Sequence, residues 1–129
     1  NHINSFFVPS HNTRAFVSGE VDMVSGVGFK DERWEEGMRR DLMDIRLIVT
    51  DLCVMDFGGP DRAVQVRSLH PGVSFEEVQE KTGFPVLKAA DLKQTVAPTP
   101  EQLALIRRLD PHDYRAAALK GNPPGIRQA

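Results

Sequence analysis

A run of β-branched and bulky apolar residues from Arg46 to Phe57 is the strongest structural signal in this chain. Such residues favour extended backbone, and the run is closed by the turn-forming sequence Gly-Gly-Pro-Asp at positions 58–61. An alternating segment from Ala63 to Leu69 follows. The pattern predicts a β-hairpin that turns at residues 58–61, so a sheet is expected at the centre of the fold.

Helix-forming patterns alternate with the extended segments. Residues 74–77 (Ser-Phe-Glu-Glu) and 99–102 (Thr-Pro-Glu-Gln) match the capping box, in which the first and fourth side chains bond free backbone amides at a helix start. Helices are therefore expected over 75–82 and from Pro100 to Leu109. Weaker patterns predict helices over 11–18, 30–44 and 110–119, extended segments over 5–8, 21–24 and 84–87, and a surface connection over 88–98. This order of elements indicates an α/β fold.

Composition excludes several classes of protein. The 129 residues are 40% hydrophobic and 26% charged, which predicts one folded domain rather than disorder. The net charge of -2 is too balanced for a nucleic-acid binder that works through phosphate contacts. Cys53 is the only cysteine, so we expect no internal disulfide, no cysteine-cluster zinc site and a reducing, cytoplasmic setting. The apolar runs are too short for a membrane span. Ile3, Phe6 and Phe7 resemble core residues, so a further segment is expected before residue 1.

The glycine-containing loop after the segment 21–24 is the candidate ligand site. Ser25, Gly26, Val27 and Gly28 would present backbone amides at the end of a predicted strand, where ligands bind in many α/β folds. These four residues are the predicted substrate-binding residues. The alternative interpretation is a loop that only bends the chain.

Other candidate residues have a structural alternative as well. His11 and His70 each follow a predicted strand and could line a site or hold a turn by hydrogen bonding. Cys53 is expected in the core, and Asp51 is either a turn carboxylate or an interface contact. The four histidines lie too far apart in sequence for a local metal motif, so no metal is expected. No combination of nucleophile, base and orienting residue can be assembled from the sequence.

Two stretches, Val49–Met55 and Leu69–Phe84, resemble the C-terminal signature of the β subunit of family I coenzyme A transferases. Upstream, His11–Val17 and Val21–Gly28 are similar to the glutaconate-type branch of that family. Thr99–Leu103 and Asp110-Pro111 match the usual tail of these subunits. The resemblance covers about residues 6–111.

The resemblance implies a three-layer α/β fold of the CoA-transferase-like class. This chain would be its C-terminal part, with residues 1–121 inside a single domain and 122–129 as a tail. It would work with a homologous α subunit and the N-terminal part of the β subunit, and it would move coenzyme A between carboxylic acids with an acyl-CoA thioester as substrate. No tightly bound cofactor, nucleic acid or membrane is expected as a partner.

The family's catalytic glutamate has no counterpart here. Glu20 and the pair Glu76-Glu77 stand in a different context, so the catalytic residue is unknown and the chain alone is expected to be inactive. Some actinobacterial members of this branch lack that glutamate and open the last ring of a steroid-derived acyl-CoA, which makes a CoA-ester hydrolase the close alternative. A non-catalytic dimerisation or scaffold half is the alternative from a different class.

Overall fold

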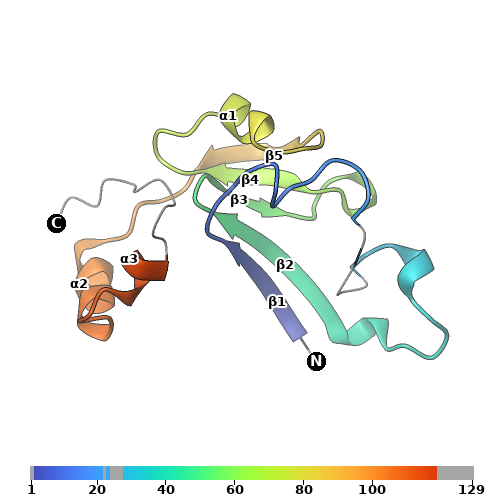
Figure 1. Cartoon of the computed structure of the whole chain (residues 1–129), viewed down its shortest axis with the longest axis horizontal. Coiled ribbons are helices and arrows are strands. Elements are labelled where there is room, and N and C mark those ends of the chain that lie inside the picture. The colour runs from blue at the N-terminus through green and yellow to red at the C-terminus, as the bar shows by residue number, and fades with distance from the viewer. Residues whose placement is uncertain (1, 22, 24–27, 119–129) are drawn as a thin grey trace. The chain divides into compact units, whose positions relative to one another are not determined.

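The computed structural model of the chain describes residues 2–21, 23 and 28–118. The chain divides into two compact units, Asn1–Thr95 and Val96–Ala129. The first unit holds the sheet and the helix α1 (Phe75–Glu80) (Figure 1). Its five strands are β1 (His2–Val8), β2 (Met43–Thr50), β3 (Cys53–Asp56), β4 (Gln65–Leu69) and β5 (Leu87–Gln94).

The sheet has the order β1-β2-β3-β4-β5. β1 pairs with β2 in parallel, β3 is antiparallel to both β2 and β4, and β4 pairs with β5 in parallel. Four strands therefore run in one direction and only β3 opposes them. The carboxyl ends of β1, β2, β4 and β5 consequently lie along one edge, which we call the carboxyl edge.

The predicted hairpin is present but shorter than expected. β3 and β4 pair on either side of a turn that includes Pro60–Arg62, as predicted. The single strand expected over 46–57 is wrong, because the chain turns after Thr50. The hydroxyl of Thr50 accepts hydrogen bonds from the amides of Leu52 (3.0 Å) and Cys53 (3.1 Å), which folds the run back on itself.

The helix expected over 30–44 is also wrong. The segment instead contains short 3₁₀ helices at Asp31–Arg33 and Arg40–Leu42, and residues from Met43 onward join β2. Gly37 separates the two turns with a left-handed φ of 88°. An α-helix cannot continue through that backbone conformation, so the helical spacing of apolar residues here has no structural counterpart.

The helix predicted over 11–18 and the strand predicted over 21–24 are not confirmed. The Asn12 side chain accepts the amide hydrogens of Arg14 (2.9 Å) and Ala15 (3.2 Å), which forms a local turn in place of a helix. Val21 and Met23 lie in irregular backbone rather than in a strand. Residues 22 and 24 lie outside the described residues.

β5 occupies most of the segment expected as a surface connection, and that expectation is wrong. Gln65 of β4 lies opposite Leu87, and Ser68 lies opposite Lys93. Pairing with β4 therefore fixes a polar segment as an edge strand, where charged side chains reach water.

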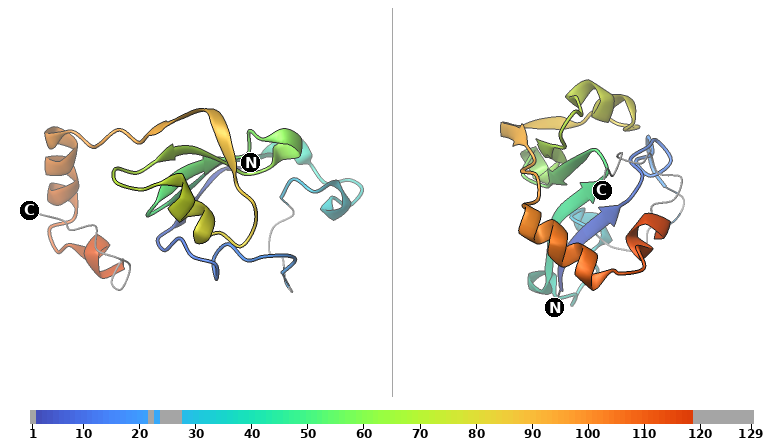
Figure 2. Two further views of the ribbon diagram at one scale, coloured as in Figure 1. Left: turned by 90° about the horizontal axis from the view of Figure 1, so that it is seen from above. Right: turned by 90° about the vertical axis from the view of Figure 1, so that its left-hand side faces the viewer.

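One face of the sheet is covered by α1. The Ser74 hydroxyl caps this helix by accepting the amide hydrogen of Glu77 at 3.1 Å, as predicted, and the helix ends at Glu80. Val78 is fully buried against Met55 of β3 and Val66 of β4. Figure 2 shows α1 on one side of the strands. The α/β class is confirmed.

The second unit contains α2 (Pro100–Leu109) and α3 (Tyr114–Ala118). The predicted capping box is complete, because the Thr99 hydroxyl accepts the amide hydrogen of Gln102 and the Gln102 side chain accepts that of Thr99. α3 is shorter than the expected helix over 110–119. In the described part of the chain no helix has the length and apolarity needed to cross a membrane. The proposed boundary at residue 121 lies outside the described residues and stays a prediction.

Candidate functional site

Gly28 is the one predicted substrate-binding residue that the structure describes, because Ser25, Gly26 and Val27 lie outside the described residues. Its φ is 63°, a left-handed value that favours glycine. Its carbonyl accepts a hydrogen bond from the indole Nε1 of Trp34 at 3.2 Å. No atom within 4 Å would meet a Cβ at this position. The loop residue is therefore held by its backbone and open on its side-chain side, and its contact with substrate stays a prediction.

A groove of about 820 Å³ is lined in part by Phe29, the residue that follows Gly28 in the sequence. It is formed by the segments 20–21 and 29–33 together with residues 61–64 of the turn between β3 and β4. The guanidinium of Arg62 lies 5.0 Å from the ring centroid of Phe29, and the Phe29 ring packs edge-on to Phe57 at 5.0 Å. Asp61 and Arg62 both have left-handed φ values, 51° and 60°. A left-handed backbone raises the conformational free energy of residues other than glycine. These two residues give the turn beside Phe29 its conformation.

A second group of polar residues lies at the carboxyl edge. His11 follows β1, Thr50 ends β2, His70 follows β4 and Thr95 follows β5. With the buried hydroxyls of Ser68 and Thr82, these side chains form a continuous hydrogen-bonded group that we call the carboxyl-edge cluster.

His11 is 3% exposed, and both of its ring nitrogens have hydrogen-bond partners inside the protein. The Thr82 hydroxyl donates to the carbonyl of Val78 at 2.7 Å, so Thr82 Oγ1 must accept from Nε2 of His11 at 2.9 Å. Nε2 therefore carries a ring hydrogen. Nδ1 lies 3.1 Å from the Thr50 hydroxyl, whose single hydrogen is also within reach of the Cys53 carbonyl at 3.3 Å.

Burial lowers the pKa of His11, with an opposing effect from the Asp51 carboxylate and a further lowering by Lys81. A second ring proton would also point at Thr50 Oγ1, which already accepts two backbone amides. The ring stacks on Phe16 at 4.2 Å between centroids. Both ring nitrogens are thus occupied inside the protein, which confirms that His11 holds the turn.

His70 also has both ring nitrogens bonded inside the protein. Its Nε2 lies 2.9 Å from the carbonyl oxygen of Thr50, which can only accept. Nδ1 lies 3.0 Å from the Thr95 hydroxyl, which is hydrogen-bonded to the Ser68 hydroxyl at 2.8 Å. Both histidines converge on Thr50, one through its hydroxyl and the other through its carbonyl. His70 thus also holds a turn, and its hydrogen bonds join the ends of β2, β4 and β5.

Cys53 and Asp51 have the structural roles expected of them. Cys53 is fully buried, and burial raises the pKa of its thiol to about 11 in spite of a hydrogen bond with Thr50. A thiol of this kind is a core residue and a poor nucleophile. Asp51 Oδ1 accepts the backbone amide hydrogen of His11 at 2.7 Å, so the carboxylate belongs to the turn.

Three acidic residues of the first unit, Glu76, Glu77 and Asp56, have structural partners. Glu77 pairs with Lys81 at 2.7 Å, and Glu76 lies 3.9 Å from Lys88. Asp56 accepts from the Gly58 amide and the Gln65 side chain, and so closes the hairpin. Among the described residues no group of three or more potential metal ligands comes together. No catalytic residue is assigned to residues 2–21, 23 and 28–118.

No protein-family model matches the chain. It is 42% identical over 116 residues to the cholesterol ring-cleaving hydrolase IpdB subunit of Rhodococcus jostii, a match that covers 89% of this chain and 45% of the relative. It is also 41% identical over 78 residues to a subunit of the 3-oxoadipate CoA-transferase of Pseudomonas knackmussii, covering 60% of this chain and 29% of the relative.

Solved structures of related enzymes also match the chain. The IpdAB structure from Rhodococcus jostii RHA1 matches with a TM-score of 0.78 and 39% identity over 91% of this chain and 47% of that chain. Glutaconate coenzyme A-transferase from Acidaminococcus fermentans matches with a TM-score of 0.62 and 28% identity over 81% of this chain and 40% of that chain. The chain belongs to coenzyme A transferase family I. It is of the β-subunit type, as the sequence motifs predicted.

Family membership leaves the reaction open, because the fold carries more than one chemistry. The decarboxylase AibA/AibB matches with a TM-score of 0.65 and 26% identity over 88% of this chain and 40% of that chain. The chain spans about half the length of the curated hydrolase relative and less of the transferase. The activity, substrate and partners of the whole protein are therefore matters for proposal.

Proposed function

We propose that the chain is the C-terminal part of the β subunit of a CoA-ester hydrolase that opens a ring in a steroid-derived acyl-CoA. The observation that carries this proposal is the extent of the match to the ring-cleaving hydrolase, which covers 89% of the chain in sequence and reaches a TM-score of 0.78 in structure. The transferase matches cover less of the chain, 60% in sequence and 81% in structure. We therefore propose ring opening as the first candidate function and CoA transfer as the second, whereas the sequence motifs favoured CoA transfer.

The chain would contribute scaffold and substrate contacts in such an enzyme. The carboxyl-edge cluster fixes the turns at the ends of β1, β2, β4 and β5, and the loop at Gly28 would contact the acyl-CoA. A homologous α subunit and the N-terminal part of the β subunit would supply the reacting groups. No tightly bound cofactor is proposed. The buried, unpaired Cys53 fits a reducing compartment, and we propose the cytoplasm.

The two reactions differ in what they consume. Hydrolytic ring opening adds one water molecule across a ring bond and leaves coenzyme A on the product. Transfer requires an acceptor carboxylate and forms a new thioester. In the hydrolysis a general base would activate water and an oxyanion site would hold the developing charge.

The test uses the full-length β subunit purified together with its α subunit. A ring-bearing acyl-CoA is incubated with the complex, with and without an added carboxylic acid, and the thioesters are identified by mass spectrometry. The proposal predicts a product heavier by one water in both mixtures. A new thioester that forms only when the acid is present would contradict it.

CoA transfer is the second candidate function. It is favoured by the match to the 3-oxoadipate CoA-transferase at 41% identity. In the same experiment, a new thioester that forms only when the carboxylic acid is added would identify CoA transfer. The scaffold alternative predicts instead that substitutions in the loop at Gly28 leave both kcat and KM unchanged.

A further inference from the structure

Trp34, the only tryptophan of the chain, is hydrogen-bonded to the backbone of Gly28. It follows the short 3₁₀ helix Asp31–Arg33, and its amide donates to the carbonyl of Asp31 at 3.0 Å. The half-buried indole thereby returns to a residue six positions earlier, where Nε1 donates to the Gly28 carbonyl at 3.2 Å. An indole nitrogen can only donate, so the direction of this hydrogen bond is certain.

The face of the indole ring is contacted as well. The guanidinium of Arg40 lies 5.3 Å from the centroid of the Trp34 ring, within the range of a cation–π interaction. Nη1 of Arg40 also donates to Oδ1 of Asp31 at 2.5 Å. Asp31, Trp34 and Arg40 thus form a connected group, which we call the Trp34 cluster.

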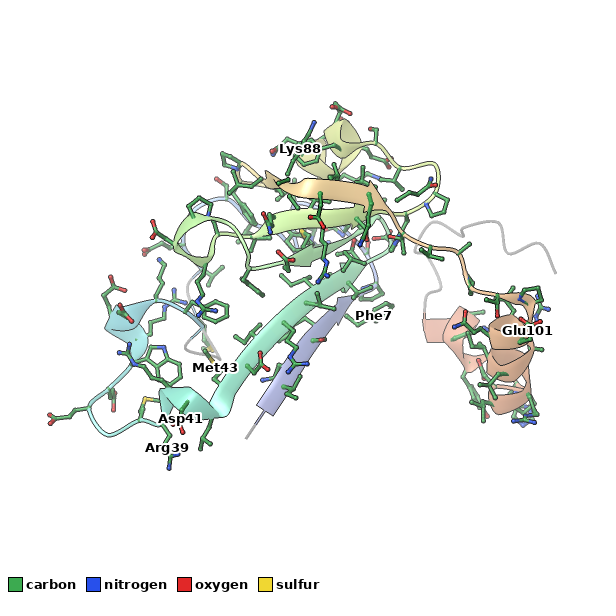
Figure 3. The ribbon with its side chains drawn as sticks, turned by 180° about the vertical axis from the view of Figure 1, so that it is seen from behind. Phe7, Arg39, Asp41, Met43, Lys88 and Glu101 are labelled. Atoms are coloured by element: carbon green, nitrogen blue, oxygen red, sulfur yellow. The ribbon has the colours of Figure 1, made fainter. Side chains whose placement is uncertain are left out.

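The neighbouring Arg39 belongs to a separate ion pair. Its Nε and Nη2 donate to the two carboxylate oxygens of Asp41 at 2.7 Å and 2.5 Å. Figure 3 labels Arg39 and Asp41 in the stretch that leads into β2. Arg39 and Arg40 therefore place the same charge at adjacent positions, and of these two arginines Arg40 is the one that contacts the indole.

Gly28 has a backbone that needs to be held in place. A glycine has no Cβ, so it leaves a left-handed conformation such as φ = 63° at little cost. The hydrogen bond from Trp34 restrains its carbonyl, and the next residue, Phe29, contacts Phe57 and Arg62. The peptide between Gly28 and Phe29 is thus restrained at both ends, while the space beside the Gly28 Cα stays open.

The groove of about 820 Å³ is lined by the same segment, through Phe29, Asp31 and Arg33 among others. By restraining the start of this segment, the Trp34 hydrogen bond fixes one wall of the groove. Backbone groups in such sites recognise polar ligand atoms. In a steroid-derived acyl-CoA, most polar atoms belong to the thioester and the coenzyme A part rather than to the ring.

We propose that Trp34 is a positioning residue for the acyl-CoA, because it fixes the Gly28 peptide in the orientation that contacts the thioester and coenzyme A part of the ligand. This inference rests on the proposed function, which supplies the acyl-CoA and its contact with Gly28. Trp34 itself does not touch the reacting atoms. Loss of its N–H group therefore weakens binding and leaves the chemical step nearly unchanged, which raises KM and not kcat.

Calorimetric titration of the complete αβ complex with acetyl-CoA tests the proposal. Acetyl-CoA carries the thioester and coenzyme A but has no ring to open, so its binding does not depend on which reaction the enzyme performs. Trp34→Phe keeps an aromatic ring and removes the donor. The expected rise in the Kd of acetyl-CoA is about three- to tenfold, the effect of one lost hydrogen bond. A Kd within about twofold of the parent value, in a variant with the parent's circular dichroism, would overturn the proposal.

The same variant gives a kinetic readout in the ring-opening assay. KM for the ring-bearing acyl-CoA should rise by about the same factor as the Kd, and kcat should stay within about twofold of the parent value. A merely structural role would lower the amount of active enzyme and therefore kcat. A fall in kcat with an unchanged KM would overturn the positioning role.

Arg40→Ala and Arg39→Ala form the matched pair of variants. Each removes one positive charge, so a general attraction to the phosphates of coenzyme A would weaken equally in both. The proposal predicts a rise in Kd of about two- to fivefold for Arg40→Ala, which loses its contact with the indole, and of less than about twofold for Arg39→Ala. Equal rises would assign the effect to charge and overturn the role of the Trp34 cluster.

Hydrogen exchange in the unmodified complex does not depend on the folding of a variant. Bound acetyl-CoA should slow the exchange of the amides from Gly28 to Trp34. Unchanged exchange there, in a complex that binds acetyl-CoA, would overturn this inference alone. A parent complex that does not bind acetyl-CoA would contradict the proposed function and, with it, this inference.

Discussion

Nε2 of His11 donates a hydrogen bond to Oγ1 of Thr82 at 2.9 Å, across 71 positions of the sequence. This contact joins the loop after β1 to the end of α1. Nδ1 of the same imidazole lies within hydrogen-bond distance, 3.1 Å, of the hydroxyl of Thr50 at the end of β2. One side chain thus holds together three segments that meet at the carboxyl edge.

Replacement of His11 by alanine should destabilise the protein by about 2–4 kcal/mol, because it leaves a cavity and unpaired hydroxyls in a buried site. Urea denaturation of the variant and the parent protein measures the difference. His112→Ala is the control, because His112 is exposed and should change stability by less than about 0.5 kcal/mol. A loss no larger than that of the control would show that the cluster is not the structural support described above.

The burial of His11 predicts a pH dependence of stability. Because burial lowers its pKa in the folded protein, the unfolded chain binds more protons once the pH falls below about 6.5. The contribution of His11 is therefore fully present above that pH and is lost as the pH falls toward the folded-state pKa. Denaturation curves above and below pH 6.5 should show a smaller pH effect in His11→Gln than in the parent protein. An equal pH effect in both proteins would assign it to other groups.

Gly83 should be intolerant of any side chain. A Cβ at this position would lie 2.5 Å from the Ser18 amide nitrogen and 2.6 Å from the Phe16 carbonyl oxygen, both backbone atoms. The Gly83 amide also donates to that carbonyl at 2.7 Å. Gly83→Ala is expected to cost about 2–4 kcal/mol of stability.

Gly37→Ala is the comparison for the Gly83 substitution. Gly37 has open space around it and a φ of 88°, so alanine there meets only backbone strain of about 1 kcal/mol. Thermal denaturation of both variants shows which substitution lowers stability more. A smaller loss for Gly83→Ala than for Gly37→Ala would contradict the close approach of residues 16–18 to residue 83.

Cys53 should resist thiol reagents in the folded protein. With a pKa of about 11, roughly one thiol in a thousand is ionised at pH 8, and the side chain is also fully buried. Labelling should become rapid only when urea unfolds the chain. Rapid labelling of the native protein would mean that the β2–β3 turn opens readily.

Gly28→Val tests the predicted substrate loop. The left-handed φ of 63° strains a β-branched residue, and the open side of Gly28 would be filled. In the assembled enzyme we expect the KM for the acyl-CoA to rise by about tenfold or more. Gly19→Val, at another left-handed glycine, controls for backbone strain. Unchanged KM and kcat in a folded Gly28→Val protein would remove the loop from the site.

Local signals were sufficient for part of the fold. The caps at Ser74 and Thr99 place α1 and α2 correctly, because each depends on residues within four positions of one another. The helix predicted over 30–44 is wrong because Gly37 has a left-handed φ, which interrupts a helix even though the apolar residues have helical spacing. β5 could not be predicted because its pairing with β4, rather than its own polar composition, holds it in the sheet.

The carboxyl-edge cluster shows the limit of sequence reasoning about the site. The sequence correctly placed His11 and His70 after strands, where each could line a site or hold a turn. Their common partner, Thr50, is separated from them by 39 and 20 positions and has no sequence pattern that marks it. The resemblance to family motifs identified the fold, although the motifs themselves do not show which residues are in contact.

The central claim is that the complete enzyme opens a ring of an acyl-CoA with water. Incubation of the αβ complex with a ring-bearing acyl-CoA in oxygen-18 water tests it most directly. We predict a product that retains coenzyme A, gains the mass of one water and carries one labelled oxygen, without any acceptor acid. A product that lacks the label would contradict the claim, and a thioester formed only on an added carboxylic acid would contradict it and identify a transferase.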